Sequence, residues 1–259
     1  MPRVPRQFSK TGFYHIMMRG LNRERIFEKV DAKKTMLNFL AEKVADSDVG
    51  IYAYCIMDNH IHLLLKAEPE DLVAYMKKVN GSFASHYNRE ENRIGPVFQG
   101  RYKRECVEDE RYFWGVLRYI HRNPVQAYMV KVPQEYEWSS IKDYLSGKSR
   151  LLDEKALQLK RENFSDNESF LKMHEEEDLK IYLDVNEDLD KMKGSVARKL
   201  IQRALQENGA SQVLELRQKG NAFQNLLDKL AVEVKLTYKE IAELTDLSYS
   251  MVQRLVSKA

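Results

Sequence analysis

The stretch that decides the fold is Met57-Asp58-Asn59-His60-Ile61-His62-Leu63-Leu64-Leu65, in which a turn-forming start leads into an apolar run with two histidines. On a β-strand, alternate side chains point to the same face. His60 and His62 are therefore predicted to project together, about 7 Å apart at ~3.3 Å per residue. Two neutral imidazoles side by side provide half of a divalent-metal site. On the pair alone, two strand histidines without any ligand role are the alternative.

The segments around this strand predict an α+β domain. The expected elements are a strand at 13–20, a helix at 32–45 capped by Asp31, strands at 49–56 and 60–66, a helix at 69–89, a strand at 102–107 and a helix at 110–121 with Pro124 just past its end. This β-α-β-β-α-β-α order is the split-βαβ plan of ferredoxin-like and RRM-like domains, an antiparallel sheet with helices on one face. The short turn at 57–59 makes 60–65 a central strand paired with 49–56.

Composition restricts the class of protein. The chain has 259 residues, enough for one large domain or for one catalytic domain plus a smaller one. Its formal net charge of +3 is only weak support for a nucleic-acid partner. Cys55 and Cys106 have no metal-like spacing, which favours a reduced, cytoplasmic protein. Residues 1–6 precede no apolar core, so no signal peptide is expected, and no apolar run is long enough for a membrane span.

The chain is predicted to have three parts: a domain at 1–150, an acidic helical connector at 151–190 and an all-α C-terminal domain at 191–259. In the last part, Thr237–Glu240 forms a capping box, Thr245–Ser248 a turn and Tyr249–Ser257 a second helix, with 224–232 as a packing helix. This pattern predicts a helix-turn-helix at 237–257, with a small helical bundle for protein contact as the alternative. The side chains expected to face a DNA groove are Ser248, Tyr249, Ser250, Gln253 and Arg254.

A second motif, Leu117-Arg118-Tyr119-Ile120-His121-Arg122-Asn123-Pro124, adds chemistry to the histidines. On a helix, Tyr119 and Asn123 are neighbours at i and i+4. The Tyr119 phenol is a candidate nucleophile and Asn123 a neutral oxygen ligand. His121 points ~200° away from Tyr119 at 3.6 residues per turn, so we interpret it as a packing or DNA-contact residue. Tyr112, two turns before Tyr119, is the rival nucleophile.

The chain resembles the single-tyrosine HUH transposases, and more narrowly their REP-associated tyrosine transposase branch. The resemblance covers roughly residues 8–146, so the domain at 1–150 is expected to be the catalytic one. It rests on Phe13–Gly20 with Asn22-Arg23, Met57–Leu65, Phe98–Lys103, Tyr119–Pro124 and Trp138–Ser140.

The resemblance implies a DNA transposase and endonuclease that nicks and rejoins single-stranded or hairpin DNA. In this reaction His60, His62 and Asn123 hold one Mg²⁺ or Mn²⁺, and Tyr119 attacks the phosphate to form a covalent 5′-phosphotyrosine. Mn²⁺ suits imidazole ligands better than Mg²⁺ does. Related insertion-sequence enzymes often have Gln where Asn123 stands, and the shorter side chain requires a closer approach of the helix.

Basic and amide side chains around the metal strand are expected to grip DNA phosphates. They are Arg19, Arg23, Arg25, Gln99, Arg101, Lys103 and Arg104. A non-catalytic DNA-binding regulator that uses the C-terminal helix-turn-helix is the alternative function. A replication-initiator-like HUH nickase is a third, disfavoured because the chain has no helicase-like P-loop. Dimerisation, with or without exchange of the tyrosine helix, is left open.

Overall fold

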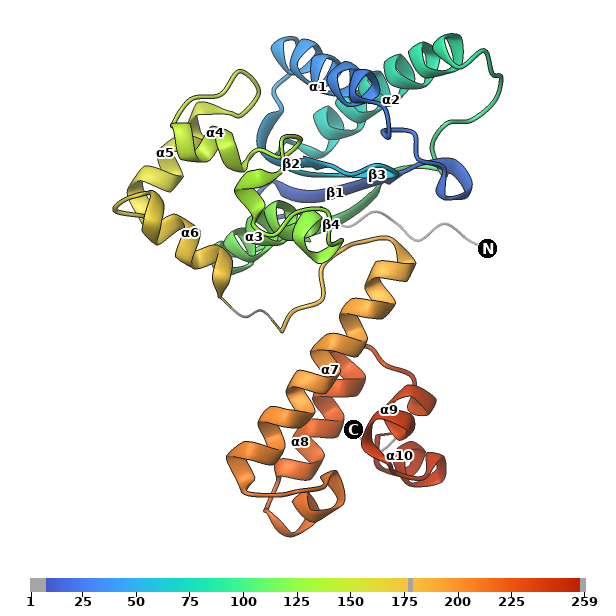
Figure 1. Ribbon diagram of the computed structural model, residues 1–259, viewed down its shortest axis with the longest axis vertical. Coiled ribbons are helices and arrows are strands. Elements are labelled where there is room, and N and C mark those ends of the chain that lie inside the picture. The colour runs from blue at the N-terminus through green and yellow to red at the C-terminus, as the bar shows by residue number, and fades with distance from the viewer. Residues whose placement is uncertain (1–7, 177–178, 257–259) are drawn as a thin grey trace. The chain divides into compact units, whose positions relative to one another are not determined.

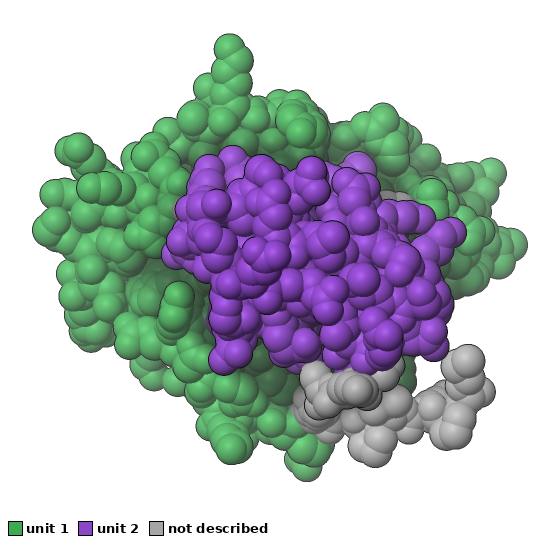
Figure 2. Space-filling model, turned by 90° about the horizontal axis from the view of Figure 1, so that it is seen from below, with its two compact units in different colours: residues 1–176 green, residues 177–259 purple. Residues whose placement is uncertain are grey.

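A computed structural model describes residues 8–176 and 179–256 of the chain. The chain divides into two compact units, residues 1–176 and 177–259, which are coloured separately in Figure 2. The expectations for residues 1–6 and for Ser257 fall outside the described residues. Each unit has its own core and is described by itself.

Unit 1 is built on a four-stranded antiparallel sheet with the order β2-β3-β1-β4. The strands are β1 (Phe13–Arg19), β2 (Gly50–Ile56), β3 (His60–Lys66) and β4 (Lys103–Val107). β3 pairs with β1 along its whole length, from Phe13 opposite Lys66 to Arg19 opposite His60, and its other edge pairs with β2. The prediction of a central histidine strand in a split-βαβ sheet is confirmed.

Helices lie on both faces of this sheet (Figure 1). α1 (Val30–Ala45) and α2 (Pro69–Glu90) cover one face, and α3 (Glu110–Gln126) lies against the other. α2 begins with Pro69, whose missing N–H costs nothing in the first turn, and buries Leu72, Met76, Val79 and Phe83 at helical spacing. The predicted sheet and order of elements are confirmed, but the expectation that all helices lie on one face was wrong, because α3, expected at 110–121, packs on the opposite face.

Two predicted helix ends were wrong. Lys29, not Asp31, occupies the N-cap of α1, and Asp31 lies in the first turn, where a carboxylate favours the helix dipole. α3 continues through Pro124 to Gln126, and the amide of Ala127 donates to the Asn123 carbonyl at 3.0 Å. Proline removes one hydrogen bond from a helix, and the deep burial of α3 against the sheet offsets that loss.

The segment expected to be a solvated connector starts inside unit 1. α4 (Ile141–Ser146), α5 (Glu154–Asn163) and α6 (Asn167–Glu175) complete this unit. Asp153 and Asp166 cap α5 and α6, and Ala156 and Phe170 are fully buried. The charged residues of this segment made it look solvated, although its helices bury a narrow apolar face. The compact units therefore divide at 176 rather than at 150 and 190.

Unit 2 is all-α. It contains α7 (Asn186–Asn208), a 3-10 segment (Val213–Gln218), α8 (Ala222–Asp228) with a following π-helical turn (Lys229–Glu233), α9 (Tyr238–Thr245) and α10 (Tyr249–Val256). The predicted capping box is present, because the Glu240 amide donates to Thr237 Oγ1 and Glu240 Oε2 accepts from the Thr237 amide. Leu216, Leu227, Ile241 and Val252 form part of its apolar core. In the described parts of both units, every helix is too short or too polar to cross a bilayer.

Candidate metal and nucleophile site

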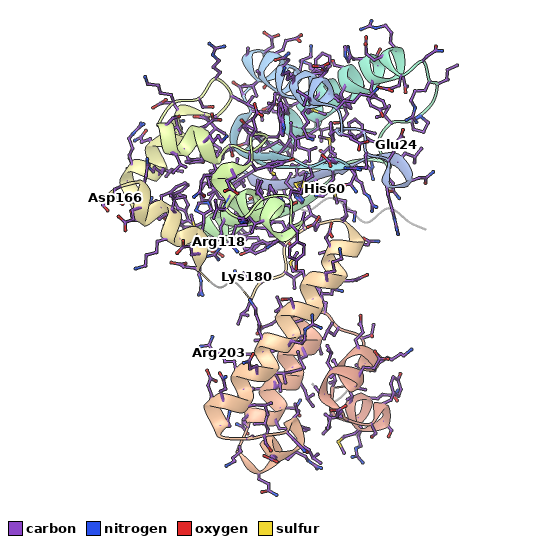
Figure 3. The ribbon with its side chains drawn as sticks, viewed as in Figure 1. Glu24, His60, Arg118, Asp166, Lys180 and Arg203 are labelled. Atoms are coloured by element: carbon purple, nitrogen blue, oxygen red, sulfur yellow. The ribbon has the colours of Figure 1, made fainter. Side chains whose placement is uncertain are left out.

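β3 places the two predicted histidines on one face, under α3. His60 and His62 are 3% and 0% exposed, and their ring centroids lie 4.9 Å apart. Figure 3 shows His60 on the sheet and Arg118 on α3. Arg118 donates to the Met173 carbonyl at 3.3 Å, which ties α3 to α6. The imidazoles are thus held on a rigid strand beneath an anchored helix.

Each imidazole has a neighbour at its Nδ1 atom. His60 Nδ1 lies 2.7 Å from Asn59 Oδ1, and His62 Nδ1 lies 3.0 Å from Nε2 of His15 on β1. An amide oxygen can only accept, so His60 carries its proton on Nδ1. A hydrogen-bond partner at one nitrogen of a histidine fixes which nitrogen is available to a metal. For His60 the atom left for a metal is then Nε2, whereas the contact between the His62 and His15 nitrogens allows either imidazole to donate.

α3 brings the predicted nucleophile and third ligand to this face. The Tyr119 ring lies 5.6 Å from the His62 ring and 6.0 Å from the His15 ring, centroid to centroid. Asn123 Nδ2 lies 3.3 Å from the Tyr119 hydroxyl and 3.5 Å from His62 Nε2. Because the oxygen and nitrogen of a carboxamide are interchangeable by a 180° rotation, Asn123 Oδ1 can take the same place. Tyr119, rather than its rival Tyr112, thus lies beside the histidines.

The donor set fits a divalent cation. The two imidazole nitrogens are borderline ligands and the amide oxygen is a hard one, a neutral set that suits Mn²⁺ better than Mg²⁺. All three side chains are buried and belong to one chain. The Asn123 amide lies 3.5 Å from His62 Nε2, so this short side chain reaches the face of the sheet that carries the histidines.

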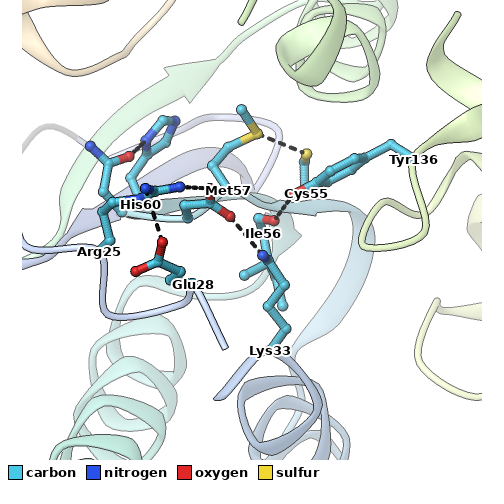
Figure 4. Close-up of polar contacts among 10 residues, drawn as sticks. Arg25, Glu28, Lys33, Cys55, Ile56, Met57, His60 and Tyr136 are labelled. Atoms are coloured by element: carbon cyan, nitrogen blue, oxygen red, sulfur yellow. Dashed lines mark hydrogen bonds and ion pairs between the residues drawn. The ribbon is translucent and has the colours of Figure 1, made fainter. Parts of the chain in front are cut away.

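The turn before His60 is clamped to α1 (Figure 4). Asp58 accepts from the buried Lys33 at 2.7 Å and from Arg25 at 2.6 Å. Burial acts to raise the pKa of the Asp58 carboxyl, but the hydrogen bonds from Lys33 and Arg25 outweigh it and lower that pKa. The Gly20 amide also donates to the Asn59 carbonyl at 2.8 Å. These contacts fix the start of β3, and with it the position of His60.

The expected DNA contacts have different surroundings. Arg25 forms ion pairs with Asp58 and Glu28, so its charge is already paired within the protein. The Arg104 guanidinium lies 5.4 Å from the Tyr14 ring centroid. Arg19 and Arg104 are half-buried, whereas the exposed members are Arg23, Arg25, Gln99, Arg101 and Lys103. In unit 2 the expected groove-facing residues are all exposed: Ser248, Tyr249, Ser250, Gln253 and Arg254.

One end of β1 gathers several of these residues. Arg19 is opposite His60 in the sheet, and the Gln99 amide donates to the Arg19 carbonyl at 2.9 Å. Gly20 forms an isolated bridge with Phe98. The motif Phe98–Lys103 therefore lies at the same end of the strands as His60, although about forty residues separate the two in sequence.

Two histidines in this region were missed by sequence reasoning. His15 contacts His62. His15 and Met17 are two residues apart on β1 and therefore share a face, and Met17 lies opposite His62, so strand periodicity could have placed His15 on the face of the two histidines. His174 on α6 accepts from His121 at 2.9 Å, in a buried chain that also includes Ser140. Burial lowers the pKa of His121 well below its ordinary value and that of His174 to about 4. His121 is thus a packing residue of α3.

Part of the chain is similar to known proteins. Residues 9–123 match the family described as IS200-like transposases. A protein of Haemophilus influenzae named as a REP-associated tyrosine transposase is 25% identical over 155 residues, 54% of this chain and 85% of that protein.

Two solved structures are similar to part of this chain. A REP-associated tyrosine transposase bound to a REP hairpin has a TM-score of 0.49 and 16% identity, over 56% of this chain and 86% of that chain. A protein from Deinococcus radiodurans described as a transposase has a TM-score of 0.34 and 16% identity, over 49% of this chain and 95% of that chain.

Proposed function

We propose that this chain is a member of the IS200-like transposase family, whose model matches residues 9–123, and that it is a metal-dependent DNA transposase and endonuclease of the REP-associated tyrosine branch. It nicks and rejoins single-stranded or hairpin DNA through a covalent 5′-phosphotyrosine. The observation that carries this proposal is the position of the Tyr119 hydroxyl, 3.3 Å from the Asn123 amide, which itself lies 3.5 Å from His62 Nε2. A nucleophile and a set of metal ligands thus share one buried face.

Roles follow from the atoms that each side chain presents. His60 and His62 hold the metal through Nε2, and Asn123 holds it through Oδ1. When bound, Mn²⁺ or Mg²⁺ supplies Lewis-acid polarisation of the scissile phosphate. The Tyr119 oxygen loses its proton to water and forms a bond to phosphorus, while the bond from phosphorus to the 3′-oxygen breaks. The number of phosphate ester bonds is unchanged, so a 3′-hydroxyl can later displace Tyr119 and rejoin the strand without ATP.

The DNA partner is proposed by analogy and by charge. The Haemophilus influenzae relative is named for its association with REP elements, which supports a palindromic, hairpin-forming substrate. Arg19, Arg23 and Gln99 cluster around the end of β1 opposite His60, and Arg101, Lys103 and Arg104 continue from there into β4. Phosphate contacts of this kind position DNA without reading its sequence.

We assign unit 2 a DNA-binding role through a helix-turn-helix. α9 and α10 are joined by residues 246–248, and α10 buries Val252 while Ser250, Gln253 and Arg254 are exposed. A short second helix with polar exposed residues is what major-groove recognition needs. This unit also supports the second candidate function, a regulator that binds DNA without cutting it.

The test is the formation of a covalent adduct. Hairpin oligonucleotides made from the palindromes that flank the chain's own gene are labelled at the 3′ end, because the enzyme stays attached to the 5′ phosphate of the 3′ fragment. With Mn²⁺ we expect a labelled species of reduced mobility on a denaturing gel for the wild type and for Tyr112→Phe. Tyr119→Phe should give none.

Three outcomes separate the alternatives. An adduct that survives in Tyr119→Phe and disappears in Tyr112→Phe would overturn the assignment of the nucleophile. DNA binding that persists in a chelator, with no cleavage of any flanking palindrome under Mn²⁺ or Mg²⁺, would favour the regulator. Hydrolysed product without an adduct would overturn the strand-transfer chemistry.

A further inference from the structure

We propose that His15 is a positioning residue for the metal site, which fixes the tautomer and ring orientation of His62, and that Glu105 sets the direction of the hydrogen bond between the two imidazoles. The inference rests on the proposed function, because it assigns His62 Nε2 to a metal. It concerns a residue that lies neither among the proposed ligands nor on the nucleophile's helix.

The sheet register brings these three side chains together. His15 lies opposite Glu105 on β4 and opposite Leu64 on β3, so it shares a face with both and is diagonal to His62. His15 is 0% exposed, its Nε2 lies 3.0 Å from His62 Nδ1, and the two ring centroids are 5.2 Å apart. Directly opposed residues in an antiparallel sheet point the same way, so this arrangement is fixed by backbone pairing.

The hydrogen bond between two neutral imidazoles has two possible directions. If His15 donates, His62 carries its own proton on Nε2 and cannot bind a metal there. If His62 donates from Nδ1, its Nε2 keeps a lone pair directed toward Asn123. Only the second direction gives a working ligand.

Glu105 favours the second direction. When His15 accepts at Nε2, its proton is on Nδ1, and Glu105 Oε2 lies 3.9 Å from that atom. This distance is too long for a hydrogen bond, but a carboxylate at this range favours an N–H directed at it over a nitrogen lone pair. The chain from Glu105 through His15 to His62 is thus an electrostatic and hydrogen-bonded support for one ligand. Asn59 supplies the equivalent support for His60.

The size of the effect follows from other metal sites. When a metal-binding histidine loses the hydrogen-bond partner of its other ring nitrogen, metal affinity falls about 10–100-fold. His15→Leu places an apolar side chain of similar size in this buried position and removes the Nε2 atom that accepts from His62. His15→Gln is the matched control, because its side-chain carbonyl oxygen extends about as far as the imidazole Nε2.

The experiment uses the full chain, free of metal and DNA. Binding of Mn²⁺ is measured by electron paramagnetic resonance of the free ion, and the imidazole tautomers are measured by ¹⁵N NMR. We expect the wild type to show His62 protonated at Nδ1, His15→Leu to bind Mn²⁺ about 10–100-fold more weakly with a mixture of His62 tautomers, and His15→Gln to stay within about threefold of the wild type.

The outcomes distinguish this inference from the proposed function. Unchanged Mn²⁺ affinity in His15→Leu would overturn the role of His15 while leaving the metal site intact. A wild-type His62 protonated at Nε2 would also overturn it, and this measurement needs no variant to fold. A wild type that binds no Mn²⁺ would overturn the proposed metal site, and with it any role for His15 there.

Discussion

Acid should destabilise unit 1 through a buried histidine chain that is separate from the proposed metal ligands. His174 Nδ1 donates to the Phe170 carbonyl at 2.8 Å, its Nε2 accepts from His121 Nδ1 at 2.9 Å, and His121 Nε2 faces Ser140 Oγ at 2.9 Å. A second proton on His174 would sit on Nε2 and point at the N–H of His121 Nδ1, so two donors would face each other. Burial and this geometry both disfavour the charged form.

The pKa of His174 is lowered to about 4 from the ordinary 6.5, chiefly by burial. As pH falls, the unfolded chain therefore takes up the proton before the folded chain does. The contribution of this group is fully present above pH 6.5, declines as pH falls through 6.5, and levels off below about 4. At ~1.4 kcal/mol per pH unit the whole effect is about 3 kcal/mol, of which about 2 kcal/mol is lost between pH 7 and pH 5.

The assay is urea unfolding followed by tryptophan fluorescence. The two tryptophans, Trp114 and Trp138, both lie in unit 1, so the signal follows that unit in the full chain. His174→Gln removes the titrating group but keeps a hydrogen-bonding side chain. We expect its free energy of unfolding to fall by about 2 kcal/mol less than that of the wild type between pH 7 and pH 5.

Comparing each protein with itself at two pH values cancels any constant cost of the substitution. His86→Gln is the control, since this imidazole lies on α2, outside the buried chain. It should keep the pH dependence of the wild type. If His174→Gln loses as much stability on acidification as the wild type does, the reasoning is refuted.

Two further predictions concern the clamp and the second unit. Asp58→Asn leaves the buried Lys33 ammonium without its carboxylate, so the free energy of unfolding of unit 1 should fall by about 2 kcal/mol or more in the same urea assay; an unchanged midpoint would show that the clamp contributes little. Arg254→Ala should weaken binding of duplex DNA and reduce the slope of log K against log salt by about 1, while adduct formation on hairpin DNA stays unchanged. Loss of the adduct in this variant would place α10 in the catalytic reaction.

The histidine strand and the tyrosine helix of unit 1 could be predicted from local patterns. Period-2 alternation identified β3, and the turn-forming residues before it fixed its pairing with β2. The i, i+4 spacing predicted that Tyr119 and Asn123 share a face of one helix. These signals lie within short windows of sequence, where the periodicity of strand and helix governs which way side chains point.

Other features depend on contacts between distant segments. The end of α3 was predicted before Pro124 because proline breaks isolated helices, yet packing against the sheet carries the helix to Gln126. The acidic segment at 151–190 resembled a solvated spacer because charged residues outnumber apolar ones in it. Phe170 is nevertheless fully buried in unit 1, since one apolar stripe is enough to dock a short helix.

By itself, the sequence determined the central histidine strand, the tyrosine helix and the order of elements that makes a split-βαβ sheet. The tertiary structure decided what surrounds each imidazole. His15 reaches His62, and Glu105 reaches His15, only because β1 lies between β3 and β4 in a particular register. Register is set by the burial of whole strand faces and by turn geometry. A pattern along one strand shows which way a histidine points, and its neighbours across the sheet determine which nitrogen it offers.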